Sequence, residues 1–268
     1  MTKAHDFLAL HAGPSPLLLP NPWDAGSARL FAWLGFEALA TTSSGSAATQ
    51  GRLDGALDRD DVMGHALAIV DATDLPVSAD LENGFGDSPD KVAETVRLAL
   101  EGGLAGCSIE DFTGRPDDPI YDFSLAEERV AAAAEVAHQT GLGLVLTGRA
   151  ENYLHGHPDL DDTITRLLAY ERAGADVLYA PGLISLDDIA QVVSSVNRPV
   201  NVLARPGGPR VSELAGAGVA RISVGGALCF AALGAAVEGA RELQEHGTYG
   251  FMERAGVGVK AARSAFAP

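Results

Sequence analysis

Short apolar runs alternate with longer amphipathic segments along the whole chain, and this alternation limits the possible folds more than any other feature. The expected strands cover residues 17–19, 36–42, 75–81, 106–110, 144–149, 177–180, 199–204 and 220–224. The expected helices follow them in turn, at 25–34, 59–72, 88–102, 124–138, 160–173, 185–196, 211–217 and 226–243. Strands that alternate with helices are typical of parallel α/β folds. Eight such pairs predict a single (β/α)8 barrel, the TIM-barrel fold.

The chain offers no internal boundary between domains. Its 268 residues are close to the length of a one-domain barrel, and no linker or low-complexity tract divides them. A doubly wound open sheet is the alternative, but its first strand is usually followed by a glycine-rich phosphate loop, whereas residues 20–26 read PNPWDAG. We therefore predict one domain over residues 1–268, with the tail from about 247 packing on the barrel or on a neighbouring subunit.

The composition excludes several classes of partner. The net charge of −17 leaves no basic footprint for nucleic acid, and an anionic membrane surface would repel such a chain. No apolar stretch approaches the roughly 20 residues of a membrane span, and no signal peptide is evident. Cys107 and Cys229 form no framework and are expected to be buried free thiols in a reducing compartment, which favours the cytoplasm.

Carboxylates gather where the predicted strands end, which is where barrel enzymes place their active sites. Asp80 and Glu82 are two residues apart and point to the same face, and Glu110 ends the neighbouring strand, ~4.8 Å away. Asp54 follows in the loop after the second strand. Two carboxylates ~4 Å apart repel by about 4 kcal/mol at an effective dielectric near 20, and Arg149 alone cannot compensate the whole set.

A hard divalent cation resolves this repulsion, and oxygen ligands favour Mg²⁺, with Mn²⁺ as a second possibility. Because Mg²⁺ keeps several waters, one carboxylate would bind it directly and the others would hold its waters. The competing interpretation of any single carboxylate here is an ordinary helix cap, as for Asp87 and Asp111. The set on adjacent strand ends is what favours a metal.

A second group of polar residues, Ser43, Ser44 and Gly45, follows the second predicted strand. A serine-rich turn with a glycine can offer several backbone N–H groups to an anion. An ordinary turn with glycine at a positive φ explains the same letters. No G-x-S-x-G motif is present, so we do not predict a serine nucleophile.

These motifs resemble the isocitrate lyase/phosphoenolpyruvate mutase superfamily, and the resemblance spans nearly the whole chain. The matching segments are residues 20–24 (PNPWD), 42–45 (TSSG), 51–55 (GRLDG), 79–86 (ADLENGFG), 108–111 (SIED) and 148–151 (GRAE). Each segment is weak alone, but their order and spacing together are specific to the superfamily.

The resemblance implies a role for each matching residue. Asp80 would be the direct Mg²⁺ ligand, and Asp54, Glu82 and Glu110 would hold its water shell. The substrate would be bound by Trp23, Ser43, Ser44, Gly45, Asp80, Arg149 and Asn201, with Arg149 pairing a carboxylate. Asp54 and Arg149 would also take part in catalysis. Relatives act on 2-oxo carboxylates, or produce them, by breaking or forming a C–C or P–C bond next to an enolate.

The loop after the fourth strand departs from the family pattern. Lyases of the family carry a Lys-Cys-Gly-His run there, and mutases carry a lysine and an asparagine, but residues 111–122 read DFTGRPDDPIYD. This argues against an isocitrate lyase and against P–C mutase chemistry. The acid–base candidates that remain in the loop are Asp111, Tyr121 and Arg115. In the fifth strand, residues 147–151 read TGRAE where relatives usually have Ala-Arg-Thr.

We therefore predict a Mg²⁺-dependent lyase, decarboxylase or hydrolase that cleaves a C–C bond of a small 2-oxo (di)carboxylate such as oxaloacetate. One alternative is a phosphonopyruvate or phosphoenolpyruvate mutase or hydrolase with a different loop. Another is a non-catalytic 2-oxo acid binding protein. The family also implies a homo-oligomer, a dimer or tetramer, in which the helix after the eighth strand is exchanged between subunits.

Overall fold

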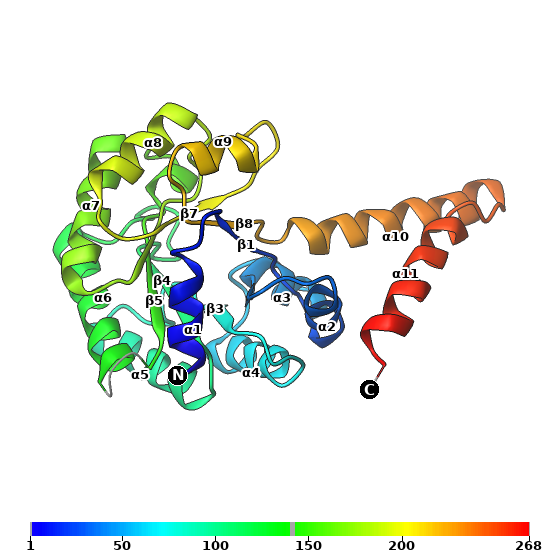
Figure 1. The fold of residues 1–268 in the computed structure, drawn as a ribbon, viewed down its shortest axis with the longest axis horizontal. Coiled ribbons are helices and arrows are strands. Elements are labelled where there is room, and N and C mark those ends of the chain that lie inside the picture. Colours follow the sequence, from blue (N-terminus) through cyan, green and yellow to red (C-terminus); the bar gives the residue numbers. More distant parts are fainter. Residues whose placement is uncertain (1, 140–142, 268) are drawn as a thin grey trace.

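The computed structural model describes residues 2–139 and 143–267, and eight parallel strands form its centre (Figure 1). The strands are β1 (Leu17–Leu19), β2 (Leu39–Ala40), β3 (Val77–Asp80), β4 (Gly106–Glu110), β5 (Val145–Arg149), β6 (Val177–Tyr179), β7 (Val200–Leu203) and β8 (Arg221–Ser223). They pair in the order β1-β8-β7-β6-β5-β4-β3-β2. Between the two ends of this order, the Ala40 N–H donates to the Pro20 carbonyl at 3.2 Å, so the barrel is nearly closed. The predicted (β/α)8 barrel is confirmed.

The predicted helices are present in the predicted order. They are α2 (Ala25–Trp33), α4 (Arg59–Val70), α5 (Pro89–Glu101), α6 (Phe123–His138), α7 (Leu160–Ala173), α8 (Leu186–Ser195), α9 (Val211–Gly216) and α10 (Ala227–His246). Short side chains fix several starts: Asp58 accepts from the Asp61 N–H at 2.9 Å and Asp159 accepts from the Asp162 N–H at 3.0 Å. Such caps satisfy N–H groups that have no partner within the helix.

Four helical segments were not predicted. They are α1 (Lys3–Leu10), α3 (Ser43–Thr49), the 3-10 turn η1 (Asn152–His155) and α11 (Met252–Ala265). The prediction of a serine-rich turn at residues 43–45 is therefore wrong, because these residues form the first turn of helix α3. Small residues permit that helix: a Cβ on Gly45 would lie 2.6 Å from Thr42 Cγ2, so the backbone there approaches its neighbours closely.

Helix α1 closes the end of the barrel opposite the strand termini that carry the acidic residues. Phe7 is fully buried, and it belongs to an apolar cluster with Leu17, Val145 and Val177 at the starts of β1, β5 and β6. A larger cluster, which includes Leu39 and Leu146, fills the layer between the strands and the helices. Above Val145, the interior is polar: Thr147 and Arg149 of β5 point inward, where barrels usually carry branched apolar side chains.

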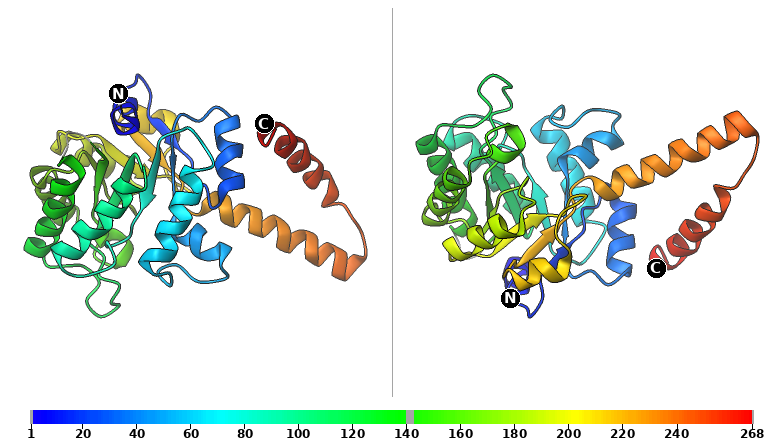
Figure 2. Two further views of the ribbon diagram at one scale, coloured as in Figure 1. Left: turned by 90° about the horizontal axis from the view of Figure 1, so that it is seen from below. Right: turned by 90° about the horizontal axis from the view of Figure 1, so that it is seen from above.

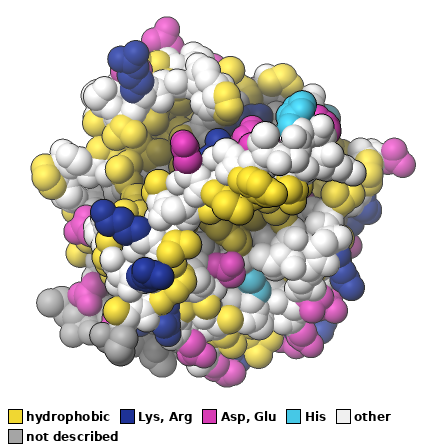
Figure 3. All heavy atoms as spheres, turned by 90° about the vertical axis from the view of Figure 1, so that its right-hand side faces the viewer, with side chains coloured by type: hydrophobic (Ala, Val, Ile, Leu, Met, Phe, Trp, Pro, Cys, Tyr) yellow, Lys and Arg dark blue, Asp and Glu magenta, His cyan; other side chains and the backbone are white. Residues whose placement is uncertain are grey.

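Helix α10 leaves the barrel and projects away from it, and α11 returns toward α2 (Figures 1 and 2). The apolar residues Leu228, Phe230, Leu233 and Val237 on α10 are all exposed in the single chain. The face of the molecule that carries these helices shows a cluster of hydrophobic side chains near its middle (Figure 3). No helix within residues 2–139 and 143–267 is long and apolar enough to cross a membrane.

Candidate active site

A cavity of about 210 Å³ opens where the strands end in acidic and hydroxyl residues. Of the residues predicted to bind substrate or metal, it is lined by Ser43, Ser44, Asp54, Asp80, Arg149 and Asn201. A larger hollow of about 640 Å³ lies between α10 and α11, but small apolar residues form much of its wall, and none of the predicted site residues reaches it. The chemistry therefore belongs to the smaller cavity inside the barrel.

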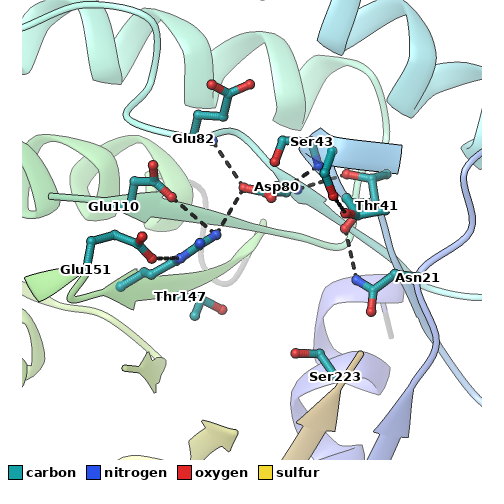
Figure 4. A network of polar contacts seen from close by, with 12 residues as sticks. Asn21, Thr41, Ser43, Asp80, Glu82, Glu110, Thr147, Glu151 and Ser223 are labelled. Carbon is teal, nitrogen blue, oxygen red and sulfur yellow. Dashed lines mark hydrogen bonds and ion pairs between the residues drawn. The ribbon is translucent and has the colours of Figure 1, made fainter. Parts of the chain in front are cut away.

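Asp80 lies at the centre of the polar network (Figure 4). Its own N–H donates to Thr41 Oγ1 at 2.9 Å, and its Oδ2 accepts from the Ser43 N–H at 3.3 Å. Its Oδ1 lies 3.5 Å from Arg149 Nη1. The end of β2, the start of α3 and the end of β5 thus converge on one carboxylate. This fixed position suits a direct ligand of a cation.

Arg149 ties the neighbouring carboxylates together. Its Nη1 lies 3.2 Å from Glu110 Oε2, and its Nε donates to Glu151 Oε1. The guanidinium carbon also lies 5.2 Å from the centre of the Tyr179 ring. Burial raises the pKa of Glu110 well above its usual range, although the charge of Arg149 opposes this. One arginine therefore does not compensate the carboxylates around it.

Glu82 and Asp54 add to this excess of negative charge. Burial, together with the charges of Asp80 and Asp54, raises the pKa of Glu82 to about 7. Burial also raises the pKa of Asp54, with the Ser43 side chain lowering it and Asp80 raising it. Glu82 has a φ of +48°, a left-handed conformation that non-glycine residues adopt at a cost and that is frequent at functional sites.

The donor set fits a hard divalent cation with a single direct protein ligand. Among residues 2–139 and 143–267, no three His, Cys, Asp or Glu side chains converge closely enough to hold a metal between them. The carboxylates of Glu82 and Glu110 do not line the cavity, whereas Asp80 does. Burial, and to a smaller extent the neighbouring carboxylates, raises the pKa of Asp54, Glu82 and Glu110, so their ionised forms are unfavourable unless a cation compensates them. Water-mediated contacts from these three residues are compatible with this arrangement.

Two of the predicted substrate contacts lie beside the cavity. A Cβ on Gly45 would lie 3.2 Å from the Cβ of Trp23, so the glycine admits the tryptophan side chain. Trp23 packs edge-on against Phe31 with ring centres 6.1 Å apart, and its carbonyl contacts His65 Nε2 at 2.8 Å. Ser43 and Ser44 do line the cavity. Packing accounts for Gly45 and Trp23 without a bound ligand.

The structure places Asp111 in a buried polar cluster outside the cavity. Its carboxylate accepts hydrogen bonds from the Glu151 N–H at 2.7 Å and the Tyr170 hydroxyl at 2.6 Å, and Arg166 Nη1 lies 3.2 Å away. It is 2% exposed. A carboxylate with these partners holds β4, β5 and α7 together.

The two other acid–base candidates of this loop also lie outside the cavity lining. The Tyr121 hydroxyl donates to Asp87 Oδ1 at 2.6 Å, and the Arg129 guanidinium lies 4.0 Å from the centre of its ring. Arg115 Nη1 lies 3.2 Å from the same Asp87 carboxylate. These contacts attach the loop to the end of the β3–α5 connection. The acid–base roles of Tyr121 and Arg115 stay predictions, and neither side chain lines the cavity.

Several residues of the site were not predicted. Glu151 holds Arg149, and the ring of His155 contacts Glu151 Oε2 at 3.1 Å while it stacks on Phe112 at 3.8 Å. Tyr179, Arg221 and Ser223 line the cavity on β6 and β8. No local signal marks Tyr179 and Arg221, because strands of three residues are too short to show which side chains face inward.

Comparisons with known proteins agree with this geometry. The sequence profile of the family described as phosphoenolpyruvate phosphomutase matches residues 7–244. The 2-methylisocitrate lyase of Escherichia coli K12 is 30% identical over 72% of this chain and 67% of its own length. The oxaloacetate decarboxylase of Pseudomonas fluorescens SBW25 is 28% identical over 88% of this chain and 82% of its own.

A solved structure from Burkholderia cenocepacia J2315, of a protein provisionally assigned as a lyase or mutase, is 53% identical and superposes with a TM-score of 0.95. It covers 99% of this chain, and 96% of that protein is covered. Sequence similarity over nearly the whole chain thus accompanies the barrel fold, the position of the cavity and the motifs around Asp80 and Arg149. The chain belongs to the phosphoenolpyruvate mutase/isocitrate lyase superfamily of lyases and mutases.

Proposed function

We propose that the protein is a Mg²⁺-dependent enzyme that cleaves a C–C bond in a small 2-oxo dicarboxylate, with oxaloacetate as the model substrate. The observation that carries this proposal is the position of Asp80, whose carboxylate faces Arg149 at 3.5 Å and the Ser43 N–H at 3.3 Å. Similarity to the oxaloacetate decarboxylase and the 2-methylisocitrate lyase supports it.

In this proposal, Asp80 would hold the cation directly, and Asp54, Glu82 and Glu110 would hold its waters. When bound, the cation supplies positive charge beside the 2-oxo group and favours the enolate that forms as the bond breaks. Arg149 would hold a substrate carboxylate through its planar guanidinium. Its contact with Glu151 fixes the orientation of that guanidinium before substrate arrives.

Asp54 is the acid–base candidate that the cavity favours. It lines the cavity from the β2–α4 connection, and its pKa is raised, chiefly by burial. A carboxylate with a raised pKa exchanges protons more readily near neutral pH than an ordinary aspartate does. We therefore propose that Asp54 moves the proton at the enolate carbon, instead of Asp111 or Tyr121.

The alternative is P–C bond chemistry, which the name of the matching family profile favours. A phosphoryl group needs cationic partners, and the loop after β4 offers only Arg115, which lies outside the cavity lining and pairs with Asp87. C–C cleavage is therefore the better match to this chain.

The experiment is a turnover assay of the purified protein with oxaloacetate, a 2-methylmalate-type acid and phosphonopyruvate, each with Mg²⁺ and with EDTA. We expect turnover of a C–C substrate that EDTA abolishes. Turnover of phosphonopyruvate alone would replace the proposal with P–C chemistry. Ligand-raised thermal stability without any turnover would indicate a binding protein.

We also propose that the protein forms a homo-oligomer in which α10 packs on a partner barrel. In barrels the helix after β8 usually covers the outside of β8 and β1, but here α10 projects away, and Leu18 of β1 is 42% exposed. Exposed apolar patches of this kind mark association sites. Light scattering coupled to size-exclusion chromatography should give a dimer or tetramer mass, and a monomer at micromolar concentration would refute this arrangement.

A further inference from the structure

A second guanidinium, that of Arg221, lies inside the barrel below the ring of carboxylates. Arg221 is the first residue of β8 and pairs in register with Leu17 of β1 and Asn201 of β7. It is 4% exposed, and it lines the same cavity as Asp80 and Arg149. Thr147, which contacts it, is two residues before Arg149 on β5, so Arg221 lies deeper in the barrel than Arg149.

The partners of Arg221 are all uncharged groups. Its Nε donates to Asn201 Oδ1 at 2.9 Å, and its Nη2 donates to Thr147 Oγ1 at 3.1 Å. Its Nη1 lies 3.4 Å from His11 Nε2, and burial together with the charge of Arg221 lowers the pKa of this imidazole to about 4. His11 is therefore neutral near pH 7. Within the described part of the chain, no carboxylate lies within 4.0 Å of the Arg221 guanidinium.

In other buried arginines of the barrel, carboxylates or backbone carbonyls compensate the positive charge, which is not the case for Arg221. Arg149 contacts Asp80, Glu110 and Glu151. Arg129 donates to the carbonyls of Asn83, Gly86 and Asp87 and stacks on Tyr121. A guanidinium carries five N–H donors, and those of Arg221 have three nearby acceptors among these residues, none of them an anion or a backbone carbonyl.

A buried cation without an anion is unfavourable, and binding an anion in the same cavity relieves that cost. The lowered pKa of Arg221, caused by burial, is consistent with an uncompensated charge. Hydroxyl groups are also available in the cavity, because Ser78, Ser108 and Ser223 line it. In the view of Figure 4, Glu82 lies on one side of Asp80, and Thr147 and Ser223 lie on the other. An anionic group therefore has polar partners at this depth.

We propose that Arg221, with Asn201 and Thr147, forms an inner anion subsite that binds the second carboxylate of a small dicarboxylate. The inference rests on the proposed function only for the identity of the outer group, a 2-oxo carboxylate near Asp80. The cavity of about 210 Å³ is below the usual size of drug-like ligand sites, which limits the ligand to a short diacid. Arg221 is then the residue that selects dicarboxylates over monocarboxylates.

The test compares succinate with butyrate, which has the same length but one carboxylate fewer. Calorimetric titrations with saturating Mg²⁺ are expected to hold one carboxylate of either acid at the outer end, so that the difference between the two acids reports on the inner subsite. We expect the wild-type protein to bind succinate at least about tenfold more tightly than butyrate, which corresponds to ~1.4 kcal/mol. The Arg221→Gln variant should bind the two acids within about threefold of each other, and Arg221→Lys should keep part of the preference.

Asn201→Asp provides a test that does not depend on removing the buried arginine. It places a carboxylate where Asn201 Oδ1 lies 2.9 Å from Arg221 Nε, so the guanidinium gains an internal anion. We expect a higher melting temperature and no succinate preference. The comparison variant is Asn201→Ser, which removes the same acceptor without adding charge. It should weaken succinate binding, because Asn201 belongs to the subsite, but succinate should still bind more tightly than butyrate.

The outcomes distinguish this inference from the proposed function. A succinate preference that Asn201→Asp removes, in a protein that turns over no 2-oxo acid, would support the inner subsite and refute the proposed reaction. Turnover of oxaloacetate together with equal binding of succinate and butyrate would support the reaction and refute the subsite. A preference that survives both Arg221→Gln and Asn201→Asp would also overturn the subsite.

Discussion

The two ends of the cavity carry opposite imbalances of charge. At the outer end, Asp54, Asp80, Glu82 and Glu110 surround the single guanidinium of Arg149. At the inner end, Arg221 contacts uncharged groups. The outer end is therefore suited to a cation, and the inner end to an anion. A metal bound to a dicarboxylate supplies both at once, which explains how one small cavity can tolerate both imbalances.

Of the changes that test this difference between the two ends, removing Arg149 should have the largest effect on stability. Arg149→Met leaves Asp80, Glu110 and Glu151 without their shared partner, and breaking a buried ion pair on one side costs about 3–5 kcal/mol. Urea unfolding in EDTA should show this loss, and Mg²⁺ should recover part of it. Arg149→Lys is the control, because it retains the charge but loses the planar contact. Unchanged stability of the Met variant would contradict the central role of this guanidinium.

Asp80→Asn tests the outer end through activity. We expect turnover of oxaloacetate to fall by about 10²–10³-fold, the usual effect of losing one group that stabilises developing charge. Folding should be retained, because the Asn side chain keeps an oxygen for the Ser43 N–H, which is 3.3 Å from Asp80 Oδ2. Circular dichroism checks the fold, and a steady-state assay across Mg²⁺ concentrations checks the activity. Wild-type turnover at low Mg²⁺ would refute direct ligation.

His11 makes the inner end sensitive to pH. Its pKa is about 4 in the folded protein and near 6.5 in the unfolded chain, so the unfolded chain binds more protons below pH 6.5. Stability is complete above pH 6.5 and falls as the pH drops toward 4. At pH 5 the loss should be about 2 kcal/mol relative to pH 7.5. The measurement is urea unfolding at both pH values, with His11→Asn as the reference that lacks the titrating imidazole. Equal pH dependence in the two proteins would show that His11 is not held neutral.

Glu82→Gln has the smallest expected effect on stability, and that effect should depend on whether Mg²⁺ is present. Burial and the charges of Asp80 and Asp54 disfavour the ionised Glu82, so the variant should be more stable than the wild type in EDTA at pH 8. The pKa shift sets an upper limit of about 3 kcal/mol, which the partial exposure of Glu82 should reduce to about 1 kcal/mol. With Mg²⁺ the advantage should disappear, because the wild type gains more from the cation. Melting temperatures of the wild type and the variant, measured with EDTA and with Mg²⁺, test this prediction. A variant that is less stable in EDTA would mean that the outer end has no excess of negative charge.

Residues at strand ends were predictable, and residues placed by tertiary packing were not. Asp80 and Glu110 follow directly from the strand pattern, because parallel strands bring their carboxyl ends to one edge. Arg221 and Tyr179 lie on strands of three residues, too short for the sequence to indicate which side chains face inward. Their inward positions depend on the register with β7 and β5.

The loop after β4 shows a different limit of sequence reasoning. Asp111 is adjacent to Glu110, yet successive strand residues face opposite sides, and its carboxylate meets Tyr170 and Arg166 in place of the cavity. The position of Tyr121 in the loop makes it an acid–base candidate, but its contacts with Asp87 and Arg129 hold it to the β3–α5 region. Partners from distant segments decide these positions, and no local pattern contains them.

Calorimetric titration of Mg²⁺ tests the central claim most directly. With oxalate present as a stand-in for the 2-oxo carboxylate unit, the wild-type protein should bind about one Mg²⁺ per chain, and Asp80→Asn should bind it at least about tenfold more weakly. Absence of Mg²⁺ binding to the wild type, or the same affinity in Asp80→Asn, would contradict the assignment of the outer end as a cation site.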